Sequence, residues 1–214
     1  MLFDMDGTLV DSEKLWDIAI NELAARYGGS VSLAARQAMV GTSMADSMAL
    51  LHADLDQPWR DPIAGTAWLE SRVAELFVTG LQWRPGALTL LKAVRAAGIP
   101  TALVTSSARM LVEVALETLG RDSFDVVVCG DEVEAPKPDP TPYLMAARAL
   151  AVPIERCVAI EDSPTGVTSA LAAGAAVLAV PSEVPIDAAL GIYLLESLVE
   201  ADLKLLCGLL AAGR

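Results

Sequence analysis

The chain has 214 residues, of which 54% are hydrophobic and 20% charged, and its formal net charge at pH 7 is −13. A chain of this length and apolar content can bury one sizeable core and a smaller module, so we expect a folded protein. The excess of acidic residues repels a nucleic-acid backbone, and we expect no nucleic-acid partner.

The chain begins with a short apolar run that ends in two carboxylates, Asp4 and Asp6, followed by Gly7 and Thr8. On a strand, residues i and i+2 point to the same face, so the two carboxylates project together where the strand gives way to a loop. They resist joint ionisation unless a cation lies between them. The pattern favours a hard metal ion and phosphoryl transfer, although by itself it is also typical of a solvated turn.

Residues 12–80 show helical patterns and no convincing strand. In the first predicted helix, apolar residues recur at helical spacing from Leu15 onward until a stop at Gly28. The predicted helices cover residues 12–27, 32–40, 45–53 and 63–78. We therefore predict an inserted all-helical cap domain over residues 12–80, which hangs over the strand ends as a lid that excludes water. Packing roles are assigned to Trp59, Trp68 and Trp83.

From residue 85 onward, short apolar strands alternate with amphipathic helices. The predicted strands cover residues 101–105, 124–129, 157–160 and 176–180, with an edge strand near 192–195. The predicted helices cover residues 85–97, 108–119, 140–150 and 165–173, with a closing helix at the end. This alternation is typical of an α/β fold with a doubly wound parallel sheet, a Rossmann-like core that we assign to residues 1–11 and 81–214.

Polar side chains stand where these strands end. They are Asp4 with Asp6, the run Thr105-Ser106-Ser107, Lys137 before a helix, and the run Glu161-Asp162-Ser163. Each group alone has an ordinary structural role, such as capping a helix or meeting solvent in a loop. Because a parallel sheet brings the carboxyl ends of its strands to one edge, where such folds bind ligands, we expect the four groups to lie together.

These motifs, in this order, resemble the haloacid dehalogenase-like hydrolase superfamily over essentially the whole chain. The Asp-x-Asp-Gly-Thr-Leu string is the most specific element, and the Lys-Pro and Glu-Asp-Ser elements follow in register. The helical insertion looks like the cap of the β-phosphoglucomutase-like and phosphoglycolate phosphatase-like branch. Within it, residues 11–16 look most like those of sugar-phosphate phosphatases.

The resemblance implies a role for each residue at the strand ends. Asp4 would be the nucleophile that forms an aspartyl-phosphate intermediate, and Asp6 would be the general acid and base. Thr105, Ser106 and Lys137 would bind the phosphoryl group. The implied reaction is the hydrolysis of a small phosphorylated metabolite, with a sugar phosphate as the leading candidate.

The implied cofactor is Mg²⁺. The ligand set would be Asp4, the carbonyl of Asp6, and Asp162 supported by Glu161, since magnesium takes few protein carboxylates and keeps several waters. The cap residues that would set substrate specificity are Trp16, Gly41, Thr42, Ser43 and Met44.

Several reactions share this scaffold, so the fold alone does not identify the chemistry. Dehalogenation needs no acid two residues after the nucleophile, so Asp6 argues against it. A phosphonate-cleaving enzyme would use a cap lysine, and no lysine occurs between Lys14 and Lys92. A hexose-phosphate mutase stays open as an alternative, although Met44 stands where such a mutase is expected to have arginine. A non-catalytic binding protein on the same fold is a second alternative.

The remaining features favour a cytoplasmic protein, which we expect to be a monomer. Cys129, Cys157 and Cys207 are widely spaced, and the first two lie in apolar runs, so we expect no disulfide and a reducing compartment. Two early carboxylates interrupt any signal-peptide core, and the longest apolar run, residues 170–180, is too short to span a bilayer. We therefore expect no membrane partner.

Overall fold

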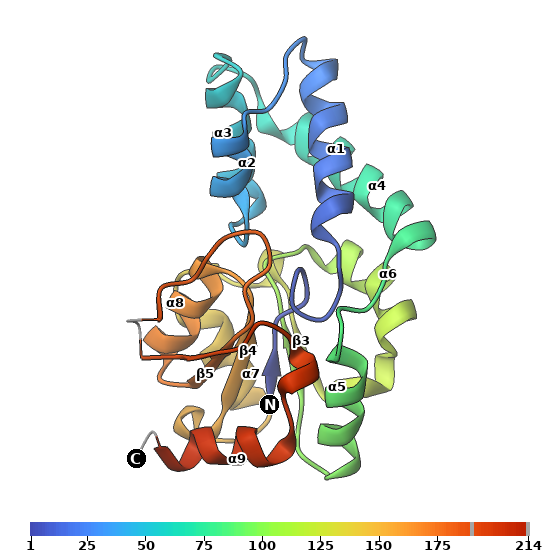
Figure 1. Cartoon of the computed structure of the whole chain (residues 1–214). Coiled ribbons are helices and arrows are strands. Elements are labelled where there is room, and N and C mark those ends of the chain that lie inside the picture. The colour runs from blue at the N-terminus through green and yellow to red at the C-terminus, as the bar shows by residue number, and fades with distance from the viewer. Residues whose placement is uncertain (189–190, 213–214) are drawn as a thin grey trace.

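A parallel sheet with helices on both faces carries further helices above the ends of its strands (Figure 1). The structure is a computed structural model that describes residues 1–188 and 191–212. The separate group of helices lies next to the edge of the sheet at which the strands end. That edge is therefore the place where residues from distant parts of the sequence come together.

The sheet has six strands in the order β3-β2-β1-β4-β5-β6, and all neighbouring pairs are parallel. The strands are β1 (Leu2–Phe3), β2 (Ala102–Val104), β3 (Val126–Val128), β4 (Val158–Glu161), β5 (Ala176–Ala179) and β6 (Tyr193–Leu194). Phe3 lies opposite Leu103 on one side and Ile160 on the other, so the chain starts in the middle of the sheet. The predicted doubly wound sheet is confirmed, and its order reverses beside β1, where such sheets bind ligands.

Helices bury both faces of the sheet. One face is covered by α5 (Ala87–Ala96), α6 (Arg109–Leu119) and α9 (Leu203–Ala212), and the other by α7 (Thr141–Ala149) and α8 (Pro164–Ala173). Successive strand residues point to opposite faces, so Phe3 packs in the first apolar cluster and Leu2 in the second. Because both faces are buried, the strands read as continuous apolar runs in the sequence.

Four helices, which we call the cap helices, lie between the first and second strands. They are α1 (Glu13–Arg26), α2 (Leu33–Met39), α3 (Met44–Asp54) and α4 (Pro62–Gly80). The two segments that lead into and out of them are hydrogen-bonded to each other, because the Asp11 N–H donates to the Gln82 carbonyl at 2.8 Å. The predicted helices are confirmed, with differences only at their ends. The division into a cap domain over 12–80 and a core over 1–11 and 81–214 stays a prediction.

The structure corrects one packing assignment and confirms others. Trp59 is 78% exposed, because it lies in the turn between α3 and α4, where no periodic helix face directs it inward. Trp68 and Trp83 pack against the apolar core as expected. Cys129 and Cys157 are buried free thiols. Among the described residues, no helix is both long and apolar enough to cross a membrane.

The central strands should contribute strongly to stability. Leu103 on β2 is fully buried, and truncation to alanine should lower the free energy of unfolding by about 2–5 kcal/mol through lost burial and the cavity left behind. Leu33, which is 73% exposed on α2, supplies the matched control and should change it by less than about 0.5 kcal/mol. Urea unfolding followed by circular dichroism measures both, and equal losses would contradict this account of the core.

Candidate active site

All four groups of strand-end residues meet at one cavity beneath the cap helices. The core contributes Asp4, Asp6, Thr105, Ser106, Ser107, Lys137, Asp162 and Ser163 to its lining. All four cap helices contribute side chains to the opposite wall. The expectation that a parallel sheet would gather these residues is therefore confirmed, although their functional roles stay predictions.

Lys137, in the loop after β3, is buried at the centre of this edge with 2% of its surface exposed. Its Nζ atom donates to Asp4 Oδ1 at 2.8 Å, to Glu161 Oε1 at 2.6 Å and to the Val104 carbonyl at 2.9 Å. Burial alone disfavours the ammonium form, but the two carboxylates outweigh it, so the pKa of Lys137 lies above its ordinary value. The lysine is a fixed cation and not a solvated loop residue.

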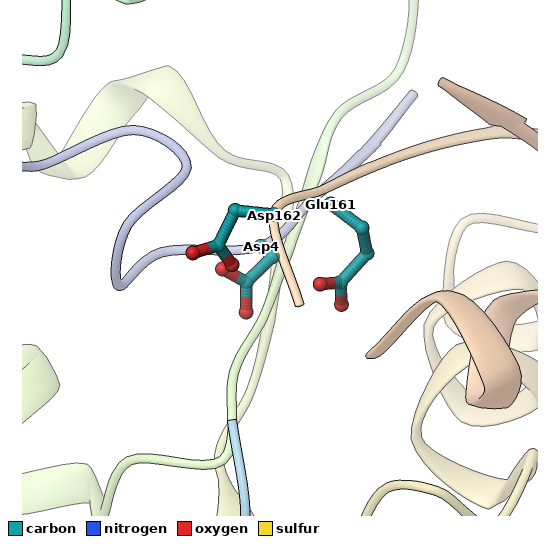
Figure 2. A group of neighbouring side chains, drawn as sticks. All are labelled: Asp4, Glu161 and Asp162. Atoms are coloured by element: carbon teal, nitrogen blue, oxygen red, sulfur yellow. The ribbon is translucent and has the colours of Figure 1, made fainter. Parts of the chain in front are cut away.

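Three buried carboxylates, from Asp4, Glu161 and Asp162, lie within 4.8 Å of one another, as measured between one oxygen of each. Figure 2 shows the Asp4 and Asp162 carboxylates side by side, with the Glu161 side chain turned the other way. Burial raises the pKa of Asp4 to about 8, with Lys137 opposing the shift and Glu161 adding to it. Burial, and then the charges of Asp4 and Glu161, raise the pKa of Asp162 well above its ordinary value. Ionised together, these groups need a further positive charge.

The donor set fits a hard divalent cation such as Mg²⁺. Asp4 Oδ2 and Asp162 Oδ2 are buried and have no hydrogen-bond partner among the described residues. Buried polar atoms are normally satisfied, and carboxylate oxygens are the ligands that Mg²⁺ prefers in proteins. Glu161 belongs less directly to this set, because its Oε1 atom already accepts hydrogen bonds from Lys137 and from the Tyr143 hydroxyl.

Gly7 allows the loop after β1 to pass against Asp162. Its φ of +74° is unfavourable for residues with a side chain, and a Cβ atom there would lie 2.0 Å from Asp162 Oδ2. The glycine of the first motif is therefore required by two independent constraints, the backbone conformation and the space beside a candidate metal ligand.

Asp6 is held by donors from two parts of the fold. Its Oδ1 atom accepts from Ser12 Oγ at 2.7 Å and from Trp16 Nε1 at 3.1 Å, both at the start of α1. Its Oδ2 atom accepts from Ser107 Oγ at 2.7 Å and from Thr105 Oγ1 at 3.4 Å, after β2. The orientation of this carboxylate therefore depends on the first cap helix as well as on the core.

Two residues without a predicted role support the site. The fully buried Tyr143 on α7 donates from its hydroxyl to Glu161, and Ser107 donates to Asp6. Ser107 belongs to the run already singled out after the second strand, so its position was a usable signal. For Tyr143, helical spacing could indicate an inward-facing ring but not the carboxylate that it meets.

The structure places most of the predicted specificity residues, but not all of them, in the wall of the cavity. Trp16, Gly41, Thr42 and Met44 line the cavity, whereas Ser43 is not among its lining residues and caps α3. The loop that carries Gly41 touches the core directly, because Ser106 Oγ donates to the Gly41 carbonyl at 3.2 Å. Their roles in substrate choice stay predictions.

The cap wall also holds a buried ion pair that the sequence analysis missed. Arg36 Nη2 lies 2.6 Å from Glu13 Oε2, and both side chains line the cavity with 12% and 7% of their surface exposed. Arg36 Nε also donates to Asp17. No short motif marks this pair, since the partners lie on different helices, α1 and α2.

Comparison with known proteins agrees with this architecture. Residues 1–174 match the family described as haloacid dehalogenase-like hydrolase. Hexitol phosphatase A of Escherichia coli is 33% identical over 198 residues, covering 86% of this chain and 84% of that protein. A phosphorylated carbohydrates phosphatase of Thermotoga maritima is 34% identical over 182 residues, covering 81% of each. The crystal structure of a CbbY mutant from Rhodobacter sphaeroides with xylulose-1,5-bisphosphate is 31% identical, with a TM-score of 0.81 over 93% of this chain and 94% of that one.

Gly7→Ala should disrupt the candidate metal site. The added methyl group collides with Asp162, so we expect at least about a tenfold loss of Mg²⁺ affinity in titration calorimetry. Gly98→Ala is the matched control, because Gly98 has a φ of +67° but no neighbouring atom within 4 Å of the position that a Cβ atom would take. It carries the same backbone strain without the collision, and an equal loss of affinity in both variants would refute the steric argument.

Lys137→Met should destabilise the fold by about 3–5 kcal/mol, because it leaves Asp4 and Glu161 buried without their counter-charge. Lys14→Met makes the same chemical change at a lysine that is 74% exposed and pairs with Asp11, and it should change stability little. Denaturant unfolding measures both variants. A small effect at Lys137 would mean that its charge does not hold the carboxylates in place.

Proposed function

This chain belongs to the haloacid dehalogenase-like hydrolases, and on that premise we propose that it is a Mg²⁺-dependent phosphatase acting on a small phosphorylated metabolite. A sugar phosphate is the substrate class that we favour, with an aspartyl-phosphate intermediate. The observation that carries the proposal is the environment of Asp4. Lys137 binds one of its carboxylate oxygens, and the other, beside Asp162, has no hydrogen bond from any residue that the structure describes.

Asp4 acts as the nucleophile. Its carboxylate attacks the phosphorus atom, the bond from phosphorus to the leaving oxygen breaks, and an acyl phosphate forms on Asp4. Water then attacks this phosphorus atom, inorganic phosphate leaves and the carboxylate is restored. The Lys137 ammonium, fixed 2.8 Å from Asp4 Oδ1, offsets negative charge that gathers on the phosphoryl oxygens.

Asp6 moves the protons of both steps. It gives a proton to the leaving oxygen in the first step and takes one from the attacking water in the second, so it finishes as it began. Its hydrogen bonds with Ser12, Trp16, Ser107 and Thr105 hold the side chain in a fixed orientation at the cavity.

Mg²⁺, when bound by Asp4, Asp162 and the Asp6 carbonyl, would supply positive charge to the phosphoryl oxygens. Thr105 and Ser106, at the end of β2, remain the phosphate-binding residues of the proposal. The cap helices, as a domain over residues 12–80, close the cavity against water, which is supported by the hydrogen bond from Ser106 to the Gly41 carbonyl.

Hydrolysis is favoured over mutase chemistry by the cap wall. A mutase must hold a second phosphate while the sugar turns over, and such a site needs cationic side chains. Met44 lines the cavity at the position considered for arginine, and Arg36 is paired with Glu13 and Asp17. Two relatives about one third identical in sequence are named phosphatases of hexitol or carbohydrate phosphates, which supports the same class for this chain.

Phosphate release from a panel of sugar phosphates, phosphoglycolate and nucleoside monophosphates tests the proposal. We expect release from sugar phosphates with Mg²⁺, none with EDTA, and a loss of at least about 10²-fold in Asp4→Asn. Asp11→Asn removes a nearby carboxylate that pairs with Lys14 outside the cavity and should retain turnover. Full activity of Asp4→Asn would show that Asp4 is not the nucleophile. If no substrate of the panel releases phosphate, the phosphatase proposal fails, and a mutase or a non-catalytic protein becomes the better explanation.

A further inference from the structure

The ion pair between Glu13 on α1 and Arg36 on α2 lies on the cap wall of the cavity. It is largely buried, it faces the cavity, and the arginine is held by a second carboxylate from Asp17. A buried ion pair rarely makes a protein more stable than apolar side chains of similar size would at the same positions. Its position instead suggests a part in selecting what enters the cavity.

The first consequence of the pair is electrostatic. The ionisable side chains that line the cavity are the carboxylates of Asp4, Asp6, Glu13 and Asp162 and the cations of Lys137 and Arg36. Both cations already contact carboxylates, so the walls carry surplus negative charge, which a bound Mg²⁺ would offset on the core side. The phosphoryl group of a substrate would lie on this core side, where the bound Mg²⁺ compensates the negative charge. A second phosphate, with a charge of about −1.5 to −2, would lie against a cap wall on which Arg36, the one cation among the described lining residues there, is already paired with carboxylates.

The second consequence concerns hydrogen-bond donors. Thr42 Oγ1 donates to the Met39 carbonyl at 2.9 Å, so the 2.9 Å contact between Thr42 and Ser47 must use the Ser47 hydroxyl hydrogen. The Trp16 N–H is likewise bound to Asp6. Of these three polar side chains, none has a hydrogen left for a ligand, whereas the Ser47 oxygen can still accept.

We propose that the cap wall selects an uncharged, hydroxyl-bearing leaving group, and that Glu13, paired with Arg36, excludes substrates that carry a second phosphate. Sugar hydroxyls donate hydrogen bonds to the acceptors on this wall, whereas a phosphate ester dianion offers acceptors only. Glu13 is thus a specificity-determining residue through charge repulsion and through its hold on Arg36. This inference rests on the proposed phosphatase function and adds to it the exclusion of bisphosphates and the residue responsible for that exclusion.

The test compares kcat/KM for the best sugar monophosphate of the panel with kcat/KM for the same sugar carrying a second phosphate. We expect the wild-type enzyme to favour the monophosphate by at least about tenfold, because like charges repel at the cap wall. Glu13→Gln removes one negative charge and leaves Arg36 with one carboxylate partner, Asp17, in place of two, so it should move this ratio toward the bisphosphate by at least about threefold. The ratio compares two substrates on one variant and is therefore independent of the fraction of folded enzyme.

Glu22→Gln is the matched control. Glu22 also lies on α1 and pairs with an arginine, Arg72 on α4, at 2.7 Å, but neither residue lines the cavity. It removes the same charge by the same chemical change, and it should leave the substrate ratio at the wild-type value. A shift of similar size in Glu22→Gln would mean that overall charge, and not the cap wall, sets the preference.

Hydrolysis of p-nitrophenyl phosphate with Mg²⁺ separates failure of the inference from failure of the proposed function. If this small ester is not hydrolysed, the proposed phosphatase activity and the inference built on it both fall. If it is hydrolysed but no sugar monophosphate is, or the bisphosphate reacts as well as the monophosphate, the inference alone is overturned. An unchanged substrate ratio in Glu13→Gln would overturn the assigned role of Glu13.

Discussion

The ammonium group of Lys137 allows carboxylates from two strands to be buried at one edge of the sheet. It contacts Asp4 after β1, the Val104 carbonyl on β2 and Glu161 on β4, so one side chain joins the three central strands at their ends. Isolated charges at this depth would be expensive to bury. Asp4 Oδ2 and Asp162 Oδ2 have no hydrogen-bond partner in the part of the chain that the structure describes, and the candidate metal site follows from this incomplete compensation.

The cap helices take part in the geometry of the core as well as covering it. Asp6 receives hydrogen bonds from Ser12 and Trp16 at the start of α1 and from Ser107 after β2, so its carboxylate is oriented only when both parts are in place. The two walls of the cavity differ in chemistry. The core wall carries Lys137 and the candidate metal site, which suit a phosphoryl group, while the cap wall carries paired charges and hydroxyl groups among apolar side chains.

Much of the fold could be predicted because local patterns and tertiary packing agree. Alternating apolar strands and amphipathic helices reflect a sheet that is buried on both faces, so the element boundaries differ only at their ends. Trp59 shows where this reasoning stops. A large aromatic residue is expected to pack, but in a turn between α3 and α4 no helix periodicity directs the side chain toward the core.

The sequence by itself determined the strand-end residues Asp4, Lys137 and Asp162, because each belongs to a short motif and a parallel sheet brings strand ends to one edge. Only the tertiary structure decided that Glu13 meets Arg36 and that Tyr143 meets Glu161. Those contacts join residues on separate elements, and they depend on how α1 and α2 pack and on the depth at which α7 lies against the sheet. Spacing along the chain carries no information on such distances. The charge of the cap wall depends on them, and so does the proposed choice of leaving group.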